Sequence, residues 1–173
     1  MRIMHLYRVD KRPFKVGEEI LPRTEFENKL EEEALVVEQV LDEVRPTMLP
    51  ARNQCLFLFH ELAGALMFWI KYGGNIYEVE PIGKIFHKGD MNKIDNILDI
   101  ARFTDDRELL KVAANEYWKP GTHTFKPCYE ILVQKAKVIK CLAIENSLQA
   151  FKNDYVAIYS IERTNMYKTL INS

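Results

Sequence analysis

The sequence is short of cysteine, and the few cysteines it has are not spaced for a disulfide framework or a zinc site. Cys55, Cys128 and Cys141 are an odd number with no short ligand pair among them. The longest apolar run, residues 62–70, is too short to cross a bilayer. Arg2 and His5 stand where a secretory signal needs an unbroken apolar stretch. We therefore expect a protein of the reducing cytoplasm without a membrane anchor.

Motifs of several enzyme classes are missing as well. There is no Gly-rich phosphate loop of the Walker type, no G-x-G-x-x-G, no H-E-x-x-H and no G-x-S-x-G. The histidines are scattered without ligand spacing, so we expect no metal site; they are His5, His60, His87 and His123. A nucleophile that pairs Cys55 or Cys128 with a histidine stays open, because the sequence cannot place its partner.

The composition is that of a folded protein. The chain has 173 residues, of which 47% are hydrophobic and 28% charged, with a net charge of -1. Neither low hydrophobicity nor high net charge argues for disorder, and the length suits one domain over residues 1–173. Charge is distributed unevenly along the chain: residues 119–173 hold 8 basic and 4 acidic side chains. The C-terminal third is thus the basic part.

Hydrophobic periodicity and breaker residues predict an α+β fold. Alternation over residues 4–10 predicts a first strand, with Leu6 and Arg8 on the opposite face from Tyr7 and Val9. Further strands are expected at residues 55–59, at 75–80 up to Pro81, at 129–143 as one strand or a hairpin, and at 155–161. Helices are expected at residues 24–44, 61–72, 92–103 and 105–118, the last opened by Asp105 with Glu108 three residues later. Helices cluster in the middle and strands come late, which favours α+β over a doubly wound sheet.

Two charged residues stand out as candidates for chemistry. Arg8 lies in the first strand, and the resemblance described below implies a phosphate-binding role for it, which its planar guanidinium suits by donating paired hydrogen bonds. The alternative is a surface arginine on an edge strand. Glu130 is the one acidic residue between Lys119 and Lys140, a stretch with five lysines. The alternative is a strand-edge glutamate neutralised by those lysines.

Three segments, in their order, resemble the ADP-ribosyltransferase superfamily. Residues 6–13, Leu-Tyr-Arg-Val-Asp-Lys-Arg-Pro, resemble the opening strand of cholera-toxin-like enzymes. Residues 52–81, with Arg-Asn-Gln-Cys before the strand and Tyr-Glu-Val-Glu-Pro at the end, are similar to the middle of rifamycin ADP-ribosyltransferases. Residues 118–140 resemble the turn-turn loop and catalytic glutamate segment, and DarT-like enzymes also place a glutamate ahead of a Leu-Val strand.

This resemblance implies a split mixed sheet with flanking helices and a mono-ADP-ribosyltransferase that uses NAD as co-substrate. Glu130 and Arg8 are then the catalytic candidates, Glu130 on the ribose and Arg8 on the pyrophosphate. The residues implied to bind NAD are Tyr7, Arg8, Asp10, Asn53, Gln54 and Tyr129, and Trp118 is a further ring that could stack on it. Asn53, Gln54 and Cys55 stand where toxin-like members carry Ser-Thr-Ser. For Tyr77, Phe57, Phe59, Phe68 and Trp69 we expect core packing.

The acceptor of the ADP-ribose is left open between nucleic acid and protein. Cys128 stands two residues before Glu130, where many protein-modifying relatives carry Glu or Gln. Lysines 119, 126, 135, 137 and 140 favour a phosphate-bearing acceptor, or serve only the phosphates of NAD. The alternatives are an NAD glycohydrolase, an RNA 2′-phosphotransferase and a non-catalytic binding module of the same fold. A role as a toxin or a phage-conflict factor is the expected context.

Overall fold

The computed structural model describes residues 4–23 and 32–142, and in these ranges the chain forms five strands and four α-helices. The strands are β1 (Leu6–Asp10), β2 (Glu19–Ile20), β3 (Leu56–Phe59), β4 (Asn75–Asp90) and β5 (Tyr129–Leu142). The helices are α1 (Glu32–Glu43), α2 (Leu62–Tyr72), α3 (Met91–Ala101) and α4 (Arg107–Trp118), with a short 3-10 turn at Arg52–Gln54. The α+β class expected from the sequence is confirmed.

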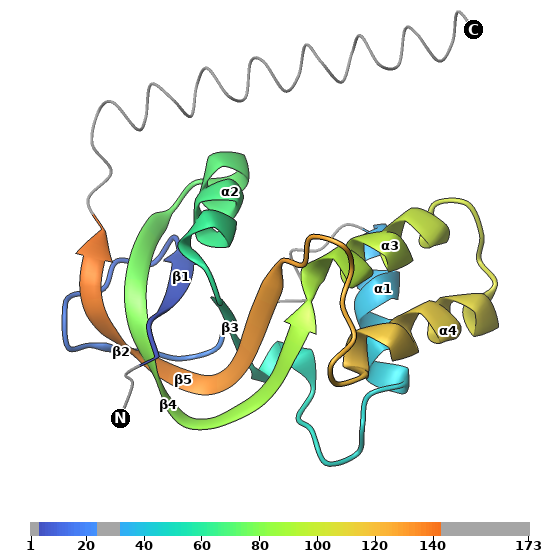
Figure 1. Cartoon of the computed structure of the whole chain (residues 1–173), viewed down its shortest axis with the longest axis horizontal. Coiled ribbons are helices and arrows are strands. Elements are labelled where there is room, and N and C mark those ends of the chain that lie inside the picture. Colours follow the sequence, from blue (N-terminus) through green and yellow to red (C-terminus); the bar gives the residue numbers. More distant parts are fainter. Residues whose placement is uncertain (1–3, 24–31, 143–173) are drawn as a thin grey trace, which may run out of the picture.

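The sheet has the order β2-β5-β3-β1-β4, and a further pairing of β4 with β5 closes it into a ring. The long strands β4 and β5 pair along most of their length and bend strongly, which allows the closure (Figure 1). The expectation of a mixed sheet is wrong for these strands, because all their pairings are antiparallel. Strands β1 and β3 pair at one position, Tyr7 opposite Phe59. Of the described pairings, this junction most resembles the split that was expected in the sheet.

The inside of this small barrel is apolar. Each strand contributes side chains to one buried cluster; they alternate along β3 and β4, and along β5 the alternation changes phase between Val133 and Ala136. The cluster consists of Leu6, Ile20, Leu56, Leu58, Tyr77, Val79, Ile131, Val133, Ala136 and Val138. Burial of this apolar surface stabilises the ring of strands.

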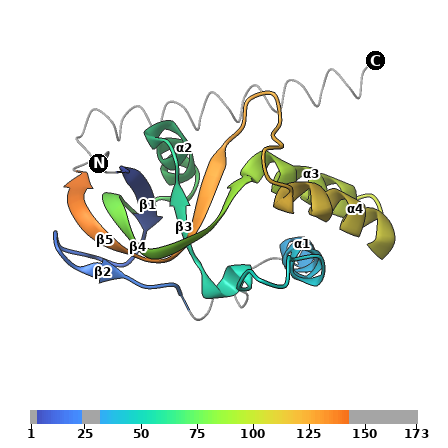
Figure 2. The same cartoon turned by 60° about the horizontal axis from the view of Figure 1, so that its bottom comes forward.

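The helices cover the outside of the barrel in two separate groups. Helix α2 packs Ala65, Trp69 and Ile70 on Val9 of β1 and Phe59 of β3. Helices α1, α3 and α4 pack on one another and gather at the other end of the barrel, where β4 ends and β5 begins (Figures 1 and 2). Because Phe59, Trp69 and Tyr77 are buried, the expectation of core packing is confirmed for these three rings.

Several element boundaries differ from those expected. Strand β4 runs through Pro81 to Asp90. Its pairing with β1 extends only as far as Val79, opposite Leu6, and a proline is tolerated where a strand has a described partner on one side only. The cap of α4 is Asp106 rather than Asp105, since Asp106 accepts from the backbone N–H groups of Glu108 and Leu109. The two-residue strand β2 was not expected. Residues 24–31 of the expected helix at 24–44, and the expected strand at 155–161, lie outside the described residues.

Over residues 4–23 and 32–142, no helix has the length and apolar character needed to span a membrane.

Candidate active site

Glu130 is the second residue of β5, and it is buried rather than exposed on a strand edge. It pairs with Phe59 of β3 on one side and Gly89 of β4 on the other, and it is 3% exposed. Its Oε1 accepts hydrogen bonds from the Arg52 guanidinium Nη1 and, at 2.5 Å, from the Tyr117 hydroxyl. In the part of the chain that the structure describes, these hydrogen bonds of Glu130 both end on Oε1. One oxygen of the carboxylate is therefore anchored, and Oε2 is left as the oxygen that can accept from a ligand.

Arg52 holds Glu130 from the 3-10 turn that precedes β3. It is 7% exposed, and it also donates to Glu38 of α1, from Nε at 2.9 Å and from Nη2 at 3.3 Å. Its guanidinium lies 4.9 Å from the ring centre of Phe57. Burial by itself lowers the pKa of Arg52, but the facing charge of Glu130, with that of Glu38, raises the pKa above its usual value. With two carboxylates around one guanidinium, this cluster carries a net charge of about -1.

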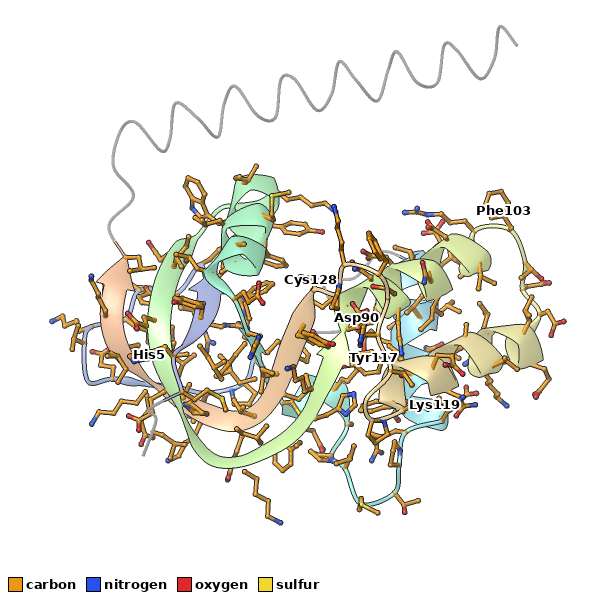
Figure 3. The ribbon with its side chains drawn as sticks, in the orientation of Figure 1. His5, Asp90, Phe103, Tyr117, Lys119 and Cys128 are labelled. Atoms are coloured by element: carbon orange, nitrogen blue, oxygen red, sulfur yellow. The ribbon has the colours of Figure 1, made fainter. Side chains whose placement is uncertain are left out.

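The side chain of Tyr117 can reach Glu130 because the residue of β4 that lies against the Tyr117 ring is Gly89. A Cβ atom added at Gly89 would lie 2.3 Å from Cε2 of Tyr117, so a larger residue leaves no room for the ring. Burial, together with the neighbouring Glu130, raises the pKa of Tyr117 well above its usual value, so the hydroxyl stays protonated and donates. His87 donates from Nε2 to the Tyr117 carbonyl at 3.1 Å, and burial lowers the pKa of this histidine. Figure 3 shows Tyr117 at the end of α4 that faces the strands.

Arg8 lies in a second charged cluster, at the junction of β1 and β3. Its Nε and Nη2 donate to Oδ2 of Asp10 at 3.0 and 2.9 Å, and its Nη1 donates to the Phe57 carbonyl at 3.0 Å. Arg12 donates to both oxygens of the same carboxylate. Although burial raises the pKa of Asp10, the hydrogen bonds and charges of Arg12 and Arg8 lower it to about 2. Two guanidiniums around one carboxylate give this cluster a net charge of about +1.

The structure does not bring Arg8 and Glu130 together on one face of the sheet. Tyr7, Phe59 and Glu130 stand opposite one another on three neighbouring strands, so their side chains share a face. Arg8, next along β1, faces the other side. The two clusters meet at Phe57, whose carbonyl accepts from Arg8 and whose ring lies under Arg52.

The other expected NAD-binding residues lie around these clusters. Tyr7 packs against the α2 side of the sheet, and Asp10 is bound to Arg8 and Arg12. Asn53 and Gln54 are exposed residues of the turn that carries Arg52. The ring of Tyr129 has the Lys88 ammonium 4.3 Å from its centre. Trp118 is buried and donates to the Leu41 carbonyl, so it belongs to the core.

Two hollows of very different size lie near the clusters, one lined by Arg8 and the other by His87, whose ring contacts Tyr117; the lining of neither includes Glu130. The one lined by Arg8, Arg23, Cys55, Leu56 and Phe57 offers about 30 Å³, enough for one or two water-sized groups. The other is about 480 Å³ and lies between β4 and the start of the segment that follows α4, with His87, Lys88, Thr122 and Tyr129 in its lining. That volume falls within the range of about 300–1,000 Å³ of small-molecule sites. The second hollow therefore has room for part of a dinucleotide, and the first for a single small group.

The sequence pattern does not single out the residues that hold Glu130. Arg52 begins the middle segment of the resemblance, and a charged residue a few positions before an apolar strand is a usable signal. Glu38 is an acidic residue next to the buried positions Val37 and Leu41 of α1. Tyr117 ends an amphipathic helix and carried no signal of its own. Gly89 could be recognised only from the pairing of β4 with β5.

Among the described residues, no group of three His, Cys, Asp or Glu side chains is arranged to hold a metal ion. No protein-family model matches the chain, and no curated protein matches it either. The class that the structure itself defines is an α+β protein with a ring-closed antiparallel sheet and a buried, ion-paired glutamate at the start of its last described strand.

Proposed function

We propose that the protein is a mono-ADP-ribosyltransferase that moves ADP-ribose from NAD to a nucleic acid or protein acceptor in the cytoplasm, as a toxin or a phage-conflict factor. The observation that carries the proposal is the state of Glu130. Its carboxylate is held at Oε1 by Arg52 and Tyr117, while Oε2 has no described protein partner. A carboxylate fixed in this way is prepared to stabilise positive charge without rearranging during the reaction.

In the proposed reaction the bond between the nicotinamide nitrogen and ribose C1′ breaks, and its electron pair leaves with nicotinamide. The acceptor then donates a lone pair to C1′ and loses its proton. Positive charge develops on the ribose in between. Oε2 of Glu130 would accept a hydrogen bond from a ribose hydroxyl, and the same carboxylate would assist loss of the acceptor's proton.

The charges of the two clusters match two different groups of this co-substrate, and the clusters face opposite sides of the sheet. The cluster of Glu130, Glu38 and Arg52 is negative overall, as stabilisation of a cationic ribose requires. The cluster of Arg8, Arg12 and Asp10 is positive overall, as binding of phosphate requires. The hollow beside Arg8 has the size of one phosphate oxygen, and we assign a ring of NAD or the acceptor to the larger hollow at Tyr129.

The lining of the larger hollow bears on the acceptor. It contains Lys88, His87 and the Tyr129 ring but neither aspartate nor glutamate among its described residues. Arginine side chains of an acceptor protein would find no counter-charge there, and Cys128 stands where many protein-modifying relatives carry Glu or Gln. A phosphate-bearing acceptor is therefore favoured over modification of arginine.

A non-catalytic protein of the same fold is the second candidate. The burial of Glu130 favours it, because an ion-paired carboxylate that is 3% exposed also serves as a structural core element.

Both candidates are tested by incubating purified protein with NAD labelled in the ADP-ribose and a cell lysate, before and after nuclease or protease. We expect label on a nuclease-sensitive or protease-sensitive species with wild type, none with Glu130→Gln, and wild-type labelling with Glu116→Gln, an exposed glutamate on α4. Loss of NAD without labelled macromolecules would indicate a glycohydrolase. No loss of NAD with any preparation would leave the non-catalytic candidate.

A further inference from the structure

Three neighbouring residues where β4 passes into α3 hold the segment that leads to Glu130. Asp90 is 1% exposed, and its Oδ2 accepts from both the backbone N–H and the hydroxyl of Thr124, each at 2.7 Å. Its Oδ1 accepts from the backbone N–H of Cys128 at 3.2 Å and of Asn92 at 3.1 Å. Asp90 thus binds the segment at two points in addition to capping its own helix.

Asn92 and Lys93 add contacts at other points of the same segment. The Asn92 amide donates to the Lys126 carbonyl at 2.7 Å and to the Thr124 hydroxyl at 3.1 Å. The Lys93 ammonium donates to the Glu116 carbonyl at 2.9 Å and to the Thr122 hydroxyl. We call Asp90, Asn92 and Lys93 the clasp. It contacts the last turn of α4 at Glu116 and the following segment from Thr122 to Cys128.

The clasp also reaches the residue two positions before Glu130. The backbone N–H of Cys128 donates to Asp90, and the Cys128 carbonyl accepts from the backbone N–H of Met91 at 2.8 Å. Both polar groups of this residue are therefore fixed two positions before Glu130. Figure 3 shows Asp90 and Cys128 close together at the junction of β4 and β5.

Helix capping alone does not explain this arrangement. Asp106 is also an N-cap, and it accepts from the backbone N–H groups of Glu108 and Leu109 in its own helix. Asp90 accepts one hydrogen bond from its own helix and three from the segment. The hydrogen bonds from Thr124 outweigh the effect of burial and lower the pKa of Asp90, so the carboxylate is charged and its bonds are strong.

We infer that the clasp is a positioning device that fixes residues 119–128 and thereby determines how ADP-ribose divides between the acceptor and water at Glu130. This inference rests on the proposed function. Residues 120–122 form one wall of the larger hollow, and Lys93 holds Thr122 in that wall. If the wall shifts, an acceptor is no longer aligned with C1′, whereas water needs no such alignment.

The test compares Asp90→Asn and Lys93→Met with Asp106→Asn, which loses capping charge without touching the segment. Asp90→Asn keeps an oxygen for the cap but places an amide against the Thr124 N–H. Amide hydrogen exchange at Thr124 and Cys128 is expected to rise about tenfold in Asp90→Asn and to stay at the wild-type value in Asp106→Asn. With labelled NAD and lysate, the ratio of transferred label to released nicotinamide is expected to fall about tenfold in both clasp variants, with nicotinamide release retained.

The possible outcomes test the role of the clasp and the proposed function separately. Unchanged exchange at Thr124 and Cys128 in Asp90→Asn would show that the clasp does not hold the segment. Increased exchange with an unchanged ratio would show that it holds the segment without controlling the acceptor. If wild type releases no nicotinamide, the proposed function fails and the inference about the acceptor with it, while the exchange measurement still reports on the clasp. If Asp90→Asn does not fold, Lys93→Met provides the same two readouts, with exchange followed at the hydrogen-bonded amides of Thr124 and Cys128.

Discussion

Arg8 and Arg52 are both bound to buried carboxylates, but the two clusters that they form carry opposite net charges. Arg8 shares Asp10 with Arg12, so one positive charge is in excess. Arg52 is shared by Glu38 and Glu130, so one negative charge is in excess. Buried charges are costly unless they are paired, which makes an excess at either place a marker of function or of a bound counter-charge.

Replacing Arg52 is expected to be far more harmful than replacing a surface arginine. Arg52→Met would leave Glu38 and Glu130 without their shared cation in the core, at a cost of about 3–5 kcal/mol in the free energy of unfolding. Arg107→Met is the control, because Arg107 is 40% exposed and its ion pair with Glu43 is on the surface. Urea unfolding at pH 7 measures both. Equal effects of the two substitutions would show that Arg52 is not the partner that Glu130 depends on.

The lowered pKa of Asp10 predicts that the free energy of unfolding depends on pH in the acid range. Its pKa is about 2 in the folded protein against an ordinary value of 3.8, so the carboxylate stabilises the fold fully above about pH 4. As pH falls through this range toward 2, about 2 kcal/mol of that contribution is lost. Urea unfolding between pH 7 and pH 2 should show this loss in wild type and in Asp99→Asn, an exposed control, but not in Asp10→Asn. The same acid loss in Asp10→Asn would contradict the assignment.

At the residue scale the sequence identified Glu130 but not its partners. Glu130 was recognisable because it is the one acidic residue in a run of lysines. Arg52 comes from a turn 78 positions earlier in the chain, and Tyr117 from the end of a helix, so their approach depends on packing that no local pattern encodes. The roles assigned to Arg8, Tyr7, Asn53 and Gln54 stay predictions.

At the scale of elements, β4 and α4 depend on each other through Gly89 and Tyr117. The strand has no side chain at Gly89, and the Tyr117 ring fills that space while its hydroxyl reaches Glu130. The sequence predicted the start of β4 at Asn75 and the end of α4 at Trp118. It did not predict the continuation of β4 past Pro81, because a proline normally ends a strand and the one-sided pairing at that point is a tertiary feature.

Gly89→Ala is expected to destabilise the protein by about 1–3 kcal/mol, because the new Cβ overlaps a buried ring that cannot move without breaking its hydrogen bonds. The double variant with Tyr117→Leu tests the cause. If the overlap with the ring is responsible, Gly89→Ala costs much less in the Tyr117→Leu background than in wild type. Thermal or urea unfolding of the four proteins gives this difference. An equal cost in both backgrounds would assign the effect to the strand backbone and not to Tyr117.

At the scale of the whole molecule, the closed ring of strands places the two charged clusters on either side of Phe57. The ring follows from the long pairing of β4 with β5 and the single pairing of β1 with β3. The order of strands and helices was predictable from periodicity, but closure was not, since it depends on contacts between residues distant in sequence. The resulting architecture places the positive cluster of Arg8 and the negative cluster of Glu130 on opposite faces of the sheet. The ligand-sized hollow is lined by His87, whose ring contacts Tyr117 of the negative cluster.

The central claim is that Glu130 stabilises the ribose of NAD during cleavage, and nicotinamide release by purified protein tests it most directly. Gln at position 130 can still accept from Arg52 and Tyr117 at its oxygen, so Glu130→Gln should retain the wild-type unfolding temperature within a few degrees. We expect nicotinamide release by wild type and a loss of at least about 100-fold in Glu130→Gln. Equal release by both proteins, or none by wild type, would contradict the account.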